Sequence, residues 1–293
     1  MENIIECRSL THYYGRRMIY KDLSFNVPKG RILGLLGKNG TGKTTTINIL
    51  SGYLEPKSGE CLIFGENIRK MSPHTRTRIG LLIEGHVQYQ FMTIREIERF
   101  YSAFYPSWKK EAYYELMGKL KVAPGQRISR MSCGQRSQVA LGLILAQNPD
   151  LLVLDDFSLG LDPGYRRLFS DYLREYAKAE GKTVFLTSHI IQDMERLVDD
   201  CIIMDYGSIL LQCPINDILG KFRIYACHAD RLPENTGEQL FHPSLIKGTL
   251  EFGSFLGKEE IELILAENGI AHSGLHCTEA TLEDTFISMT GKY

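Results

Sequence analysis

The chain has 293 residues, of which 43% are hydrophobic and 24% charged, and its formal net charge at pH 7 is −1. This is ordinary globular composition, and a near-neutral charge without a long basic stripe argues against nucleic-acid binding. No apolar run approaches the roughly 20 residues that span a bilayer, the N-terminus lacks a signal-peptide core, and the cysteines are scattered without a CxxC pair, so we expect a soluble, intracellular chain without disulfides or structural zinc.

The first part of the chain predicts antiparallel strands. A turn is expected at Tyr14-Gly15, and residues 23–27 alternate in polarity before the turn Pro28-Lys29-Gly30. A short apolar strand at 32–36 runs into a glycine-rich turn and then a helix. Residues 59–65 are predicted as a further hairpin strand.

The middle of the chain, 91–147, has a helical pattern. Thr93-x-x-Glu96 is a capping box that starts the first helix, and residues 105–108 (Tyr-Pro-Ser-Trp) end it. Further helices are predicted at 109–121 and 134–147.

Strands return at 151–155 and 183–187, with a helix at 165–179 between them. Because these strands are continuously apolar and alternate with helices, they predict a buried parallel sheet. Residues 201–212 are expected to form a hairpin that turns at Tyr206-Gly207.

The tail from residue 223 predicts strands at 223–227 and 246–252 and helices at 259–266 and 281–289. A unit of this size is marginal as an independent domain. We therefore expect it to lean on the first domain or on a second copy of the chain.

The stretch from Gly37 to Thr44 has the spacing G-x-x-x-x-G-K-[ST] between a strand and a helix. Glycines let backbone N–H groups turn inward around an anion, and the following helix adds its positive end. Lys43 supplies a point charge for the outer phosphates and Thr44 a hydroxyl for Mg²⁺. The predicted nucleotide-binding residues of this loop are Gly37, Asn39, Gly40, Thr41, Gly42, Lys43, Thr44 and Thr45.

Three polar residues follow the predicted parallel strands. Asp155 ends an apolar strand, where a carboxylate can hold Mg²⁺ opposite Thr44. Asp156 is the candidate to orient or deprotonate an attacking water, although it could instead be a capping or turn carboxylate. His189 ends the next strand and is a candidate contact for the γ-phosphate and the water.

A second candidate anion site begins at Ser132. The pattern Ser132-x-x-Gln135 is a capping box, so a plain helix start is one interpretation. The other is an anion site at a helix N-terminus, with the small residue Gly134 beside the serine hydroxyl. Two such helix starts in one chain suggest two chains that share a nucleotide.

Together these motifs resemble the ATP-binding subunits of ABC transporters over about residues 2–215. The glycine loop resembles the Walker A motif, residues 131–135 (MSCGQ) the signature motif, usually LSGGQ, and residues 151–156 the Walker B strand. Residues 160–162 (GLD), with Asp162, are similar to the D-loop, and His189 to the switch histidine. Tyr14 matches the aromatic residue that stacks on adenine.

The resemblance implies an α/β fold with a P-loop nucleotide-binding domain over residues 1–222. This domain would have a mixed sheet with a RecA-like core, an antiparallel β subdomain and a helical subdomain at about 85–147. Residues 223–293 would form a small α+β extension. The whole chain looks most like ATPases of bacterial drug and antimicrobial-peptide exporters. Two segments carry this closer resemblance, residues 104–108 and 282–286.

The same resemblance implies ATP and Mg²⁺ as cofactors and a head-to-tail pair of ATP-binding subunits, either a homodimer or a heterodimer. An integral membrane permease would be the partner, and the chain would lie in the cytoplasm on the inner face of the membrane. Tyr89, Phe91 and Met92 offer an apolar surface for that partner, with core packing as an equal alternative.

Three residues depart from the family pattern. Asp156 stands where glutamate is usual and Glu84 where many relatives have glutamine, although Glu84 could still contact water or Mg²⁺. Cys133 replaces a glycine of the signature. Asp is one methylene shorter than Glu, so we expect slow hydrolysis. The alternatives are an ATP-gated subunit with little turnover and a non-transport ATPase of the same fold.

Overall fold

The computed structural model of the chain describes residues 2–83, 89–158, 160–233 and 239–291. A six-stranded sheet with the order β10-β9-β3-β8-β7-β6 lies at its centre. All strands but β10 are parallel to their neighbours, which confirms the predicted buried parallel sheet. The strands are β3 (Ile32–Gly37), β6 (Ile79–Leu82), β7 (Leu151–Leu154), β8 (Thr183–Thr187), β9 (Asp200–Asp205) and β10 (Ser208–Pro214).

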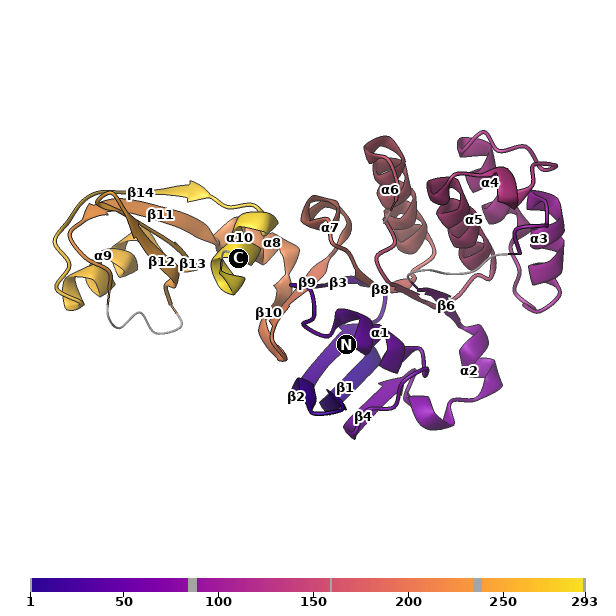
Figure 1. Cartoon of the computed structure of the whole chain (residues 1–293), viewed down its shortest axis with the longest axis horizontal. Coiled ribbons are helices and arrows are strands. Elements are labelled where there is room, and N and C mark those ends of the chain that lie inside the picture. Colours follow the sequence, from indigo (N-terminus) through magenta and orange to yellow (C-terminus); the bar gives the residue numbers. More distant parts are fainter. Residues whose placement is uncertain (1, 84–88, 159, 234–238, 292–293) are drawn as a thin grey trace.

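An antiparallel sheet faces one side of the central sheet, with α1 (Lys43–Leu50) between them (Figure 1). Its order is β2-β1-β4-β5. The hairpin strand predicted at 59–65 is present as β4 but ends at Ile63, because Phe64 (φ 52°) and Gly65 (φ 76°) form the turn into β5. The strands are β1 (Asn3–Tyr14), β2 (Arg17–Pro28), β4 (Ser58–Ile63) and β5 (Glu66–Asn67).

The apolar strands of the central sheet are buried on both faces. In β3, Leu33 and Leu35 pack with the antiparallel sheet and α1, whereas Ile32 and Leu36 pack with the helices on the opposite face. Such two-sided burial is what continuous apolar strands predict.

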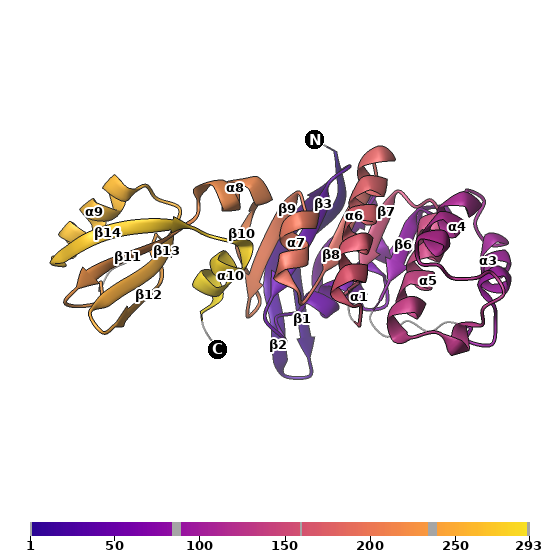
Figure 2. The same cartoon turned by 90° about the horizontal axis from the view of Figure 1, so that it is seen from above.

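Helices cover the second face and one end of the central sheet (Figures 1 and 2). The Thr93–Glu96 capping box forms as predicted, with both of its hydrogen bonds present. The helices are α3 (Ile94–Ser102), α4 (Lys110–Lys119), α5 (Cys133–Ala146), α6 (Pro163–Ala179) and α7 (Ile191–Leu197), with the short segments η1 (Ile68–Lys70), α2 (Pro73–Thr77) and η2 (Ile128–Arg130). Within the described ranges, no helix is long and apolar enough to cross a membrane.

The C-terminal part carries its own antiparallel sheet, order β12-β13-β11-β14, at the opposite end of the molecule from α3 and α4 (Figures 1 and 2). The strand predicted at 246–252 coincides with β13 only from Thr249 onward, because Lys247 (φ 51°) and Gly248 (φ 80°) form a turn that its predicted start had crossed. The elements are α8 (Ile215–Lys221), β11 (Arg223–Ala229), β12 (Phe241–Ile246), β13 (Thr249–Ser254), α9 (Lys258–Glu267) and β14 (His272–Glu279).

The last helix, α10 (Leu282–Thr290), returns to the first part of the chain. Leu282, Phe286 and Met289 belong to the same buried core as α7 and the central sheet. This packing agrees with the expectation that the tail leans on the first domain. A division at residue 222 remains a proposal, in which α10 would join the two units.

Candidate nucleotide-binding site

Glycines shape the turn between β3 and α1. Gly42 has a φ of +106°, and a Cβ placed on it would lie 2.8 Å from Cγ2 of Ile19 and 2.9 Å from Cδ1 of Tyr20. A Cβ on Gly37 would lie 2.5 Å from Oγ1 of Thr41. Because any larger residue would clash at both positions, the tight closure of this loop requires glycine there.

The side chain of Lys43 folds over this loop. It is 8% exposed, and its Nζ donates to the carbonyl oxygens of Gly37 at 2.7 Å and Lys38 at 3.0 Å. Burial lowers the pKa of Lys43, whereas the nearby Asp155 and Asp156 raise it. The loop therefore holds a buried ammonium group next to two carboxylates.

Asp155 follows β7, and Thr187 ends the neighbouring strand β8. The Thr187 hydroxyl donates to Oδ1 of Asp155 at 2.6 Å and accepts from the backbone N–H of Asp156 at 3.0 Å. Burial raises the pKa of Asp155, while hydrogen bonds from Thr187 and Thr44 lower it. Thr187 thus fixes both acidic residues, a role that the sequence reasoning did not assign to it.

Asp156 and His189 meet at the same strand ends. Oδ1 of Asp156 accepts from the backbone N–H of His189 at 3.3 Å, and Oδ2 lies 3.6 Å from Nε2 of the His189 ring. The Asp156 side chain is 4% exposed, that of His189 49%. Oδ2 of Asp156 is buried and has no hydrogen-bond partner among the described residues. A deeply placed carboxylate and an accessible imidazole therefore lie side by side.

A cavity of about 300 Å³ connects the glycine loop to these strand ends. Gly37 and Thr41 are not among its lining residues, and Thr41 instead donates its hydroxyl to the Lys38 carbonyl at 2.8 Å. The predicted residues that line the cavity are Tyr14, Asn39, Gly40, Gly42, Lys43, Thr44, Thr45, Asp155, Asp156 and His189.

Arg17 also lines this cavity, and the sequence reasoning missed it. It pairs with Tyr14 across the turn between β1 and β2, and a Cβ on Gly40 would lie 3.0 Å from Nη2 of Arg17. The basic pair Arg16-Arg17, directly after the aromatic turn, could have indicated this residue from the sequence, since a cation near an anion-binding loop favours phosphate binding.

The second candidate anion site does not line the cavity. Ser132 and Gln135 form the capping box of α5: the Ser132 hydroxyl accepts from the N–H of Gln135 at 3.2 Å, and Oε1 of Gln135 accepts from the N–H of Ser132 at 3.1 Å. A Cβ on Gly134 would lie 3.0 Å from the carbonyl oxygen of Gly160. Asp162 is exposed at the start of α6. Within one chain, these residues and the cavity are separate.

Glu84, predicted to contact water or Mg²⁺, lies outside the described residues. The structure therefore describes all the predicted site residues but this one.

Comparison with known proteins gives a consistent picture. The family model described as ABC transporter matches residues 20–158. The chain is 32% identical to "Bacitracin transport ATP-binding protein BcrA" of Bacillus licheniformis, over 99% of this chain and 98% of the relative. It is also 32% identical to "Nod factor export ATP-binding protein I" of Burkholderia orbicola, over 98% of this chain and 97% of the relative.

Among solved structures, a protein titled "Structure of ATP binding subunit of ABC transporter" superposes with a TM-score of 0.65 at 27% identity, covering 73% of this chain and 91% of that one. The structure titled "Dimeric Structure of MJ0796, a Bacterial ABC Transporter Cassette" superposes with a TM-score of 0.64 at 21% identity, covering 72% and 98% respectively, and thus shares the fold. With near-complete coverage by relatives at 32% identity, this chain belongs to the ATP-binding subunits of the ABC transporter family.

Proposed function

We propose that the chain binds and hydrolyses ATP to power export through a partner membrane permease. The observation that carries this proposal is the single cavity in which the loop lysine Lys43, the strand-end carboxylates Asp155 and Asp156, and His189 come together. A phosphate-binding loop facing a carboxylate and an imidazole is the set of groups that phosphoryl transfer to water requires.

Thr44 and Asp155 would hold Mg²⁺. They fit this ion because both residues line the cavity and offer hard oxygen ligands, which Mg²⁺ prefers. We propose Glu84 as a further contact. When bound, Mg²⁺ would neutralise charge on the phosphate oxygens.

Asp156 and His189 would handle the attacking water. Oδ2 of Asp156 accepts no hydrogen bond from the described residues and lies 3.6 Å from Nε2 of His189, so it can take the hydrogen of a water molecule beside that ring. The imidazole of His189, half exposed beside it, would donate to the γ-phosphate. Tyr14, at 48% exposure on the cavity rim, would stack on adenine.

Each ATP would be shared by two copies of the chain that face each other head to tail. The serine, glycine and glutamine at the start of α5 and Asp162 lie outside the cavity of their own chain, so a second copy would bring them to the phosphates. Two copies would supply two complete sites, and loss of the γ-phosphate would let the pair reopen.

Pairing is tested by light scattering with a non-hydrolysable ATP analogue and Mg²⁺. We expect the unaltered chain to become a dimer and Ser132→Arg to stay a monomer, because a bulky cation replaces the cap at the shared phosphates. Ser107→Arg, an exposed serine between α3 and α4, should dimerise normally. Because Ser132→Arg also loses a helix cap, its Tm must be measured. A monomeric unaltered chain at saturating analogue would contradict pairing between copies.

Export, rather than another use of ATP, is supported by the relatives, whose names assign them to bacitracin transport and Nod factor export. The partner would be an integral membrane permease, which would place the chain in the cytoplasm at the inner face of the membrane. The permease, and not this chain, would select the transported substance.

An exposed aromatic patch is the proposed docking surface for the permease. Phe91 is 68% exposed and Phe104 61%, and their rings connect through edge-to-face contacts with Tyr89 and Phe100. Aromatic residues clustered at a surface are typical of protein interfaces. The sequence offered Tyr89, Phe91 and Met92 either for this role or for core packing: Tyr89 and Phe91 are exposed in the patch, whereas Met92 packs against the core.

Phe91→Glu is expected to lower retention of the chain on permease-containing membranes by about tenfold or more, because it places a charge in an apolar contact. Tyr206→Glu is the matched control, since Tyr206 is 76% exposed on the β9–β10 turn and should retain binding. The measurement is the membrane-bound fraction after co-expression with the permease. Equal retention of both variants would exclude the patch as the docking surface.

A further inference from the structure

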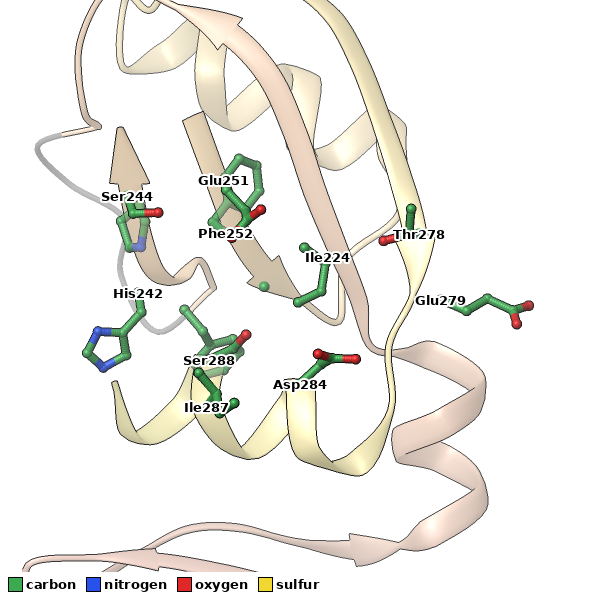
Figure 3. Close-up of a pocket in the computed structure, with 13 residues that line it drawn as sticks. Ile224, His242, Ser244, Glu251, Phe252, Thr278, Glu279, Asp284, Ile287 and Ser288 are labelled. Atoms are coloured by element: carbon green, nitrogen blue, oxygen red, sulfur yellow. The ribbon is translucent and has the colours of Figure 1, made fainter. Parts of the chain in front are cut away.

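A second cavity, of about 470 Å³, lies between the C-terminal sheet and α10 (Figure 3). The opposite face of this sheet is closed, because Tyr225, Leu250 and Phe252 are buried in a core with Ile261 and Leu265 of α9. The cavity is thus bounded by the other sheet face and by one helix. Its volume is in the range of small-molecule sites.

Close contacts fix the spacing of the cavity walls. A Cβ on Gly253 of β13 would lie 2.4 Å from Cζ of Phe222 and 2.9 Å from Cβ of Ser288 on α10. A Cβ on Gly291, directly after α10, would lie 2.7 Å from Cε1 of His242. Because only glycine permits these approaches, sheet and helix touch on two sides of the cavity, and the space between them is defined by packing.

The lining of the cavity combines apolar and acidic side chains. Ile224, Phe241 and Ile287 supply apolar walls. Asp284 points from α10 toward the sheet, and Glu251 lies on β13, on the far side of Ile224 (Figure 3). No lysine or arginine is among the described residues that line it. Oδ2 of Asp284 already accepts from the Thr281 N–H at 3.0 Å and from its hydroxyl at 2.7 Å, so Glu251 is the carboxylate that remains to pair with a ligand. An apolar space with such a carboxylate favours a ligand that carries a positive charge on an apolar body.

The helix that lines this cavity also contacts the nucleotide site. Nζ of Lys38, in the glycine loop, donates to the carbonyl oxygen of Thr290 at the end of α10. At its start, the N–H of Leu282 donates to the Glu195 carboxylate at 2.7 Å. Glu195 lies on α7, which begins two residues after His189. A displacement of α10 would therefore disturb the hydrogen bond to Lys38 in the glycine loop and the one to Glu195 on α7, close to His189.

We propose that this cavity binds a small organic cation with an aromatic or alkyl body, and that its occupancy is coupled through α10 to nucleotide binding. The first part stands on the cavity alone. The second part rests on the proposed function of the glycine loop.

Binding is tested by the fluorescence of 2-(1-naphthyl)ethylamine titrated with the full chain. We expect saturable binding, weakened about tenfold by Glu251→Gln, since one charge pair is lost in a partly enclosed site. Ser244→Phe, which fills the cavity, should abolish it. Glu267→Gln, an exposed residue at the end of α9, should leave it unchanged. No binding, equal binding by Glu251→Gln, or equal binding of 1-naphthylacetate would overturn the site.

Coupling is tested by measuring the Kd of the same amine with and without ATP-Mg²⁺, with ATP binding verified on the same sample. The two values should differ by about threefold or more, because coupling is reciprocal. Lys38→Met should bring the ratio close to one without changing the Kd measured in the absence of ATP, since Lys38 lies outside the cavity. A ratio of one in the unaltered chain that binds ATP would overturn the coupling but leave the site.

Discussion

Lys43→Ala is expected to raise the Kd for ATP by about 100-fold, or roughly 2.8 kcal/mol, the largest loss of nucleotide affinity among the substitutions considered. Lys43 is 8% exposed, and among the described residues its ammonium donates to loop carbonyl oxygens at 2.7 and 3.0 Å, so a phosphate would replace neutral partners by a charged one. Isothermal titration with a non-hydrolysable ATP analogue measures the effect.

Lys29→Ala is the matched control, because Lys29 is exposed and paired with Glu2 at 2.8 Å on the surface. It removes the same charge outside the cavity and should leave the Kd within about twofold, as exposed ion pairs contribute little. If Lys43→Ala bound the analogue as tightly as this control, the glycine loop would not be the phosphate site.

Much of the fold and site follows from local patterns. Each of the apolar strands β3, β7 and β8 is followed by polar residues that could act in nucleotide binding or hydrolysis. A parallel sheet brings the carboxyl ends of such strands to one edge. For this reason the sequence alone predicts one site for residues from three distant segments: Lys43, the pair Asp155 and Asp156, and His189. Their shared cavity agrees with that expectation.

Contacts that depend on packing between distant segments could not be predicted. Nothing in the pattern of residues 282–290 indicates that the helix end at Thr290 reaches Lys38, because that contact depends on how the C-terminal sheet is oriented. The turn at Lys247 was missed for a local reason. A lysine with a φ of 51° is uncommon, so only the following glycine signalled the turn within a stretch that otherwise favours a strand.

The start of α5 is compatible with both interpretations that the sequence offered. Ser132 and Gln135 form a capping box, as one interpretation predicted. This does not oppose the second interpretation, because a capped helix still directs its positive end outward. In the proposed pair, that end would meet the phosphate of the ATP bound by the second copy of the chain.

The position of the Asp156 carboxylate is expected to determine the rate of ATP hydrolysis. Its backbone has a φ of 44°, in the left-handed region that aspartate tolerates better than most residues, and its Oδ1 accepts from the N–H of His189 at 3.3 Å. The carboxylate is therefore held against the end of β8. A glutamate would extend further into the cavity by one methylene, about 1.5 Å, and a misplacement near 1 Å can cost on the order of 100-fold in rate.

We expect Asp156→Glu to raise the ATPase rate by about tenfold, because the longer side chain brings its carboxylate closer to the water that it must orient. Phosphate release by the purified chain, alone and with its permease, measures this. Asp156→Asn is the control for charge: it keeps the size and the left-handed backbone but cannot accept a proton, so its rate should fall by about 100-fold or more while ATP binding is retained.

The two variants together separate a slow enzyme from an ATP-gated subunit. In a slow enzyme, glutamate raises the rate and asparagine lowers it, because the Asp156 carboxylate takes part in turnover. In a gated subunit, neither substitution changes the low rate, since the nucleotide serves only to close the pair. Glutamate at this backbone position costs some stability, so the Tm of Asp156→Glu must show that it is folded. With that established, an unchanged or lower rate for Asp156→Glu would defeat the explanation based on the missing methylene.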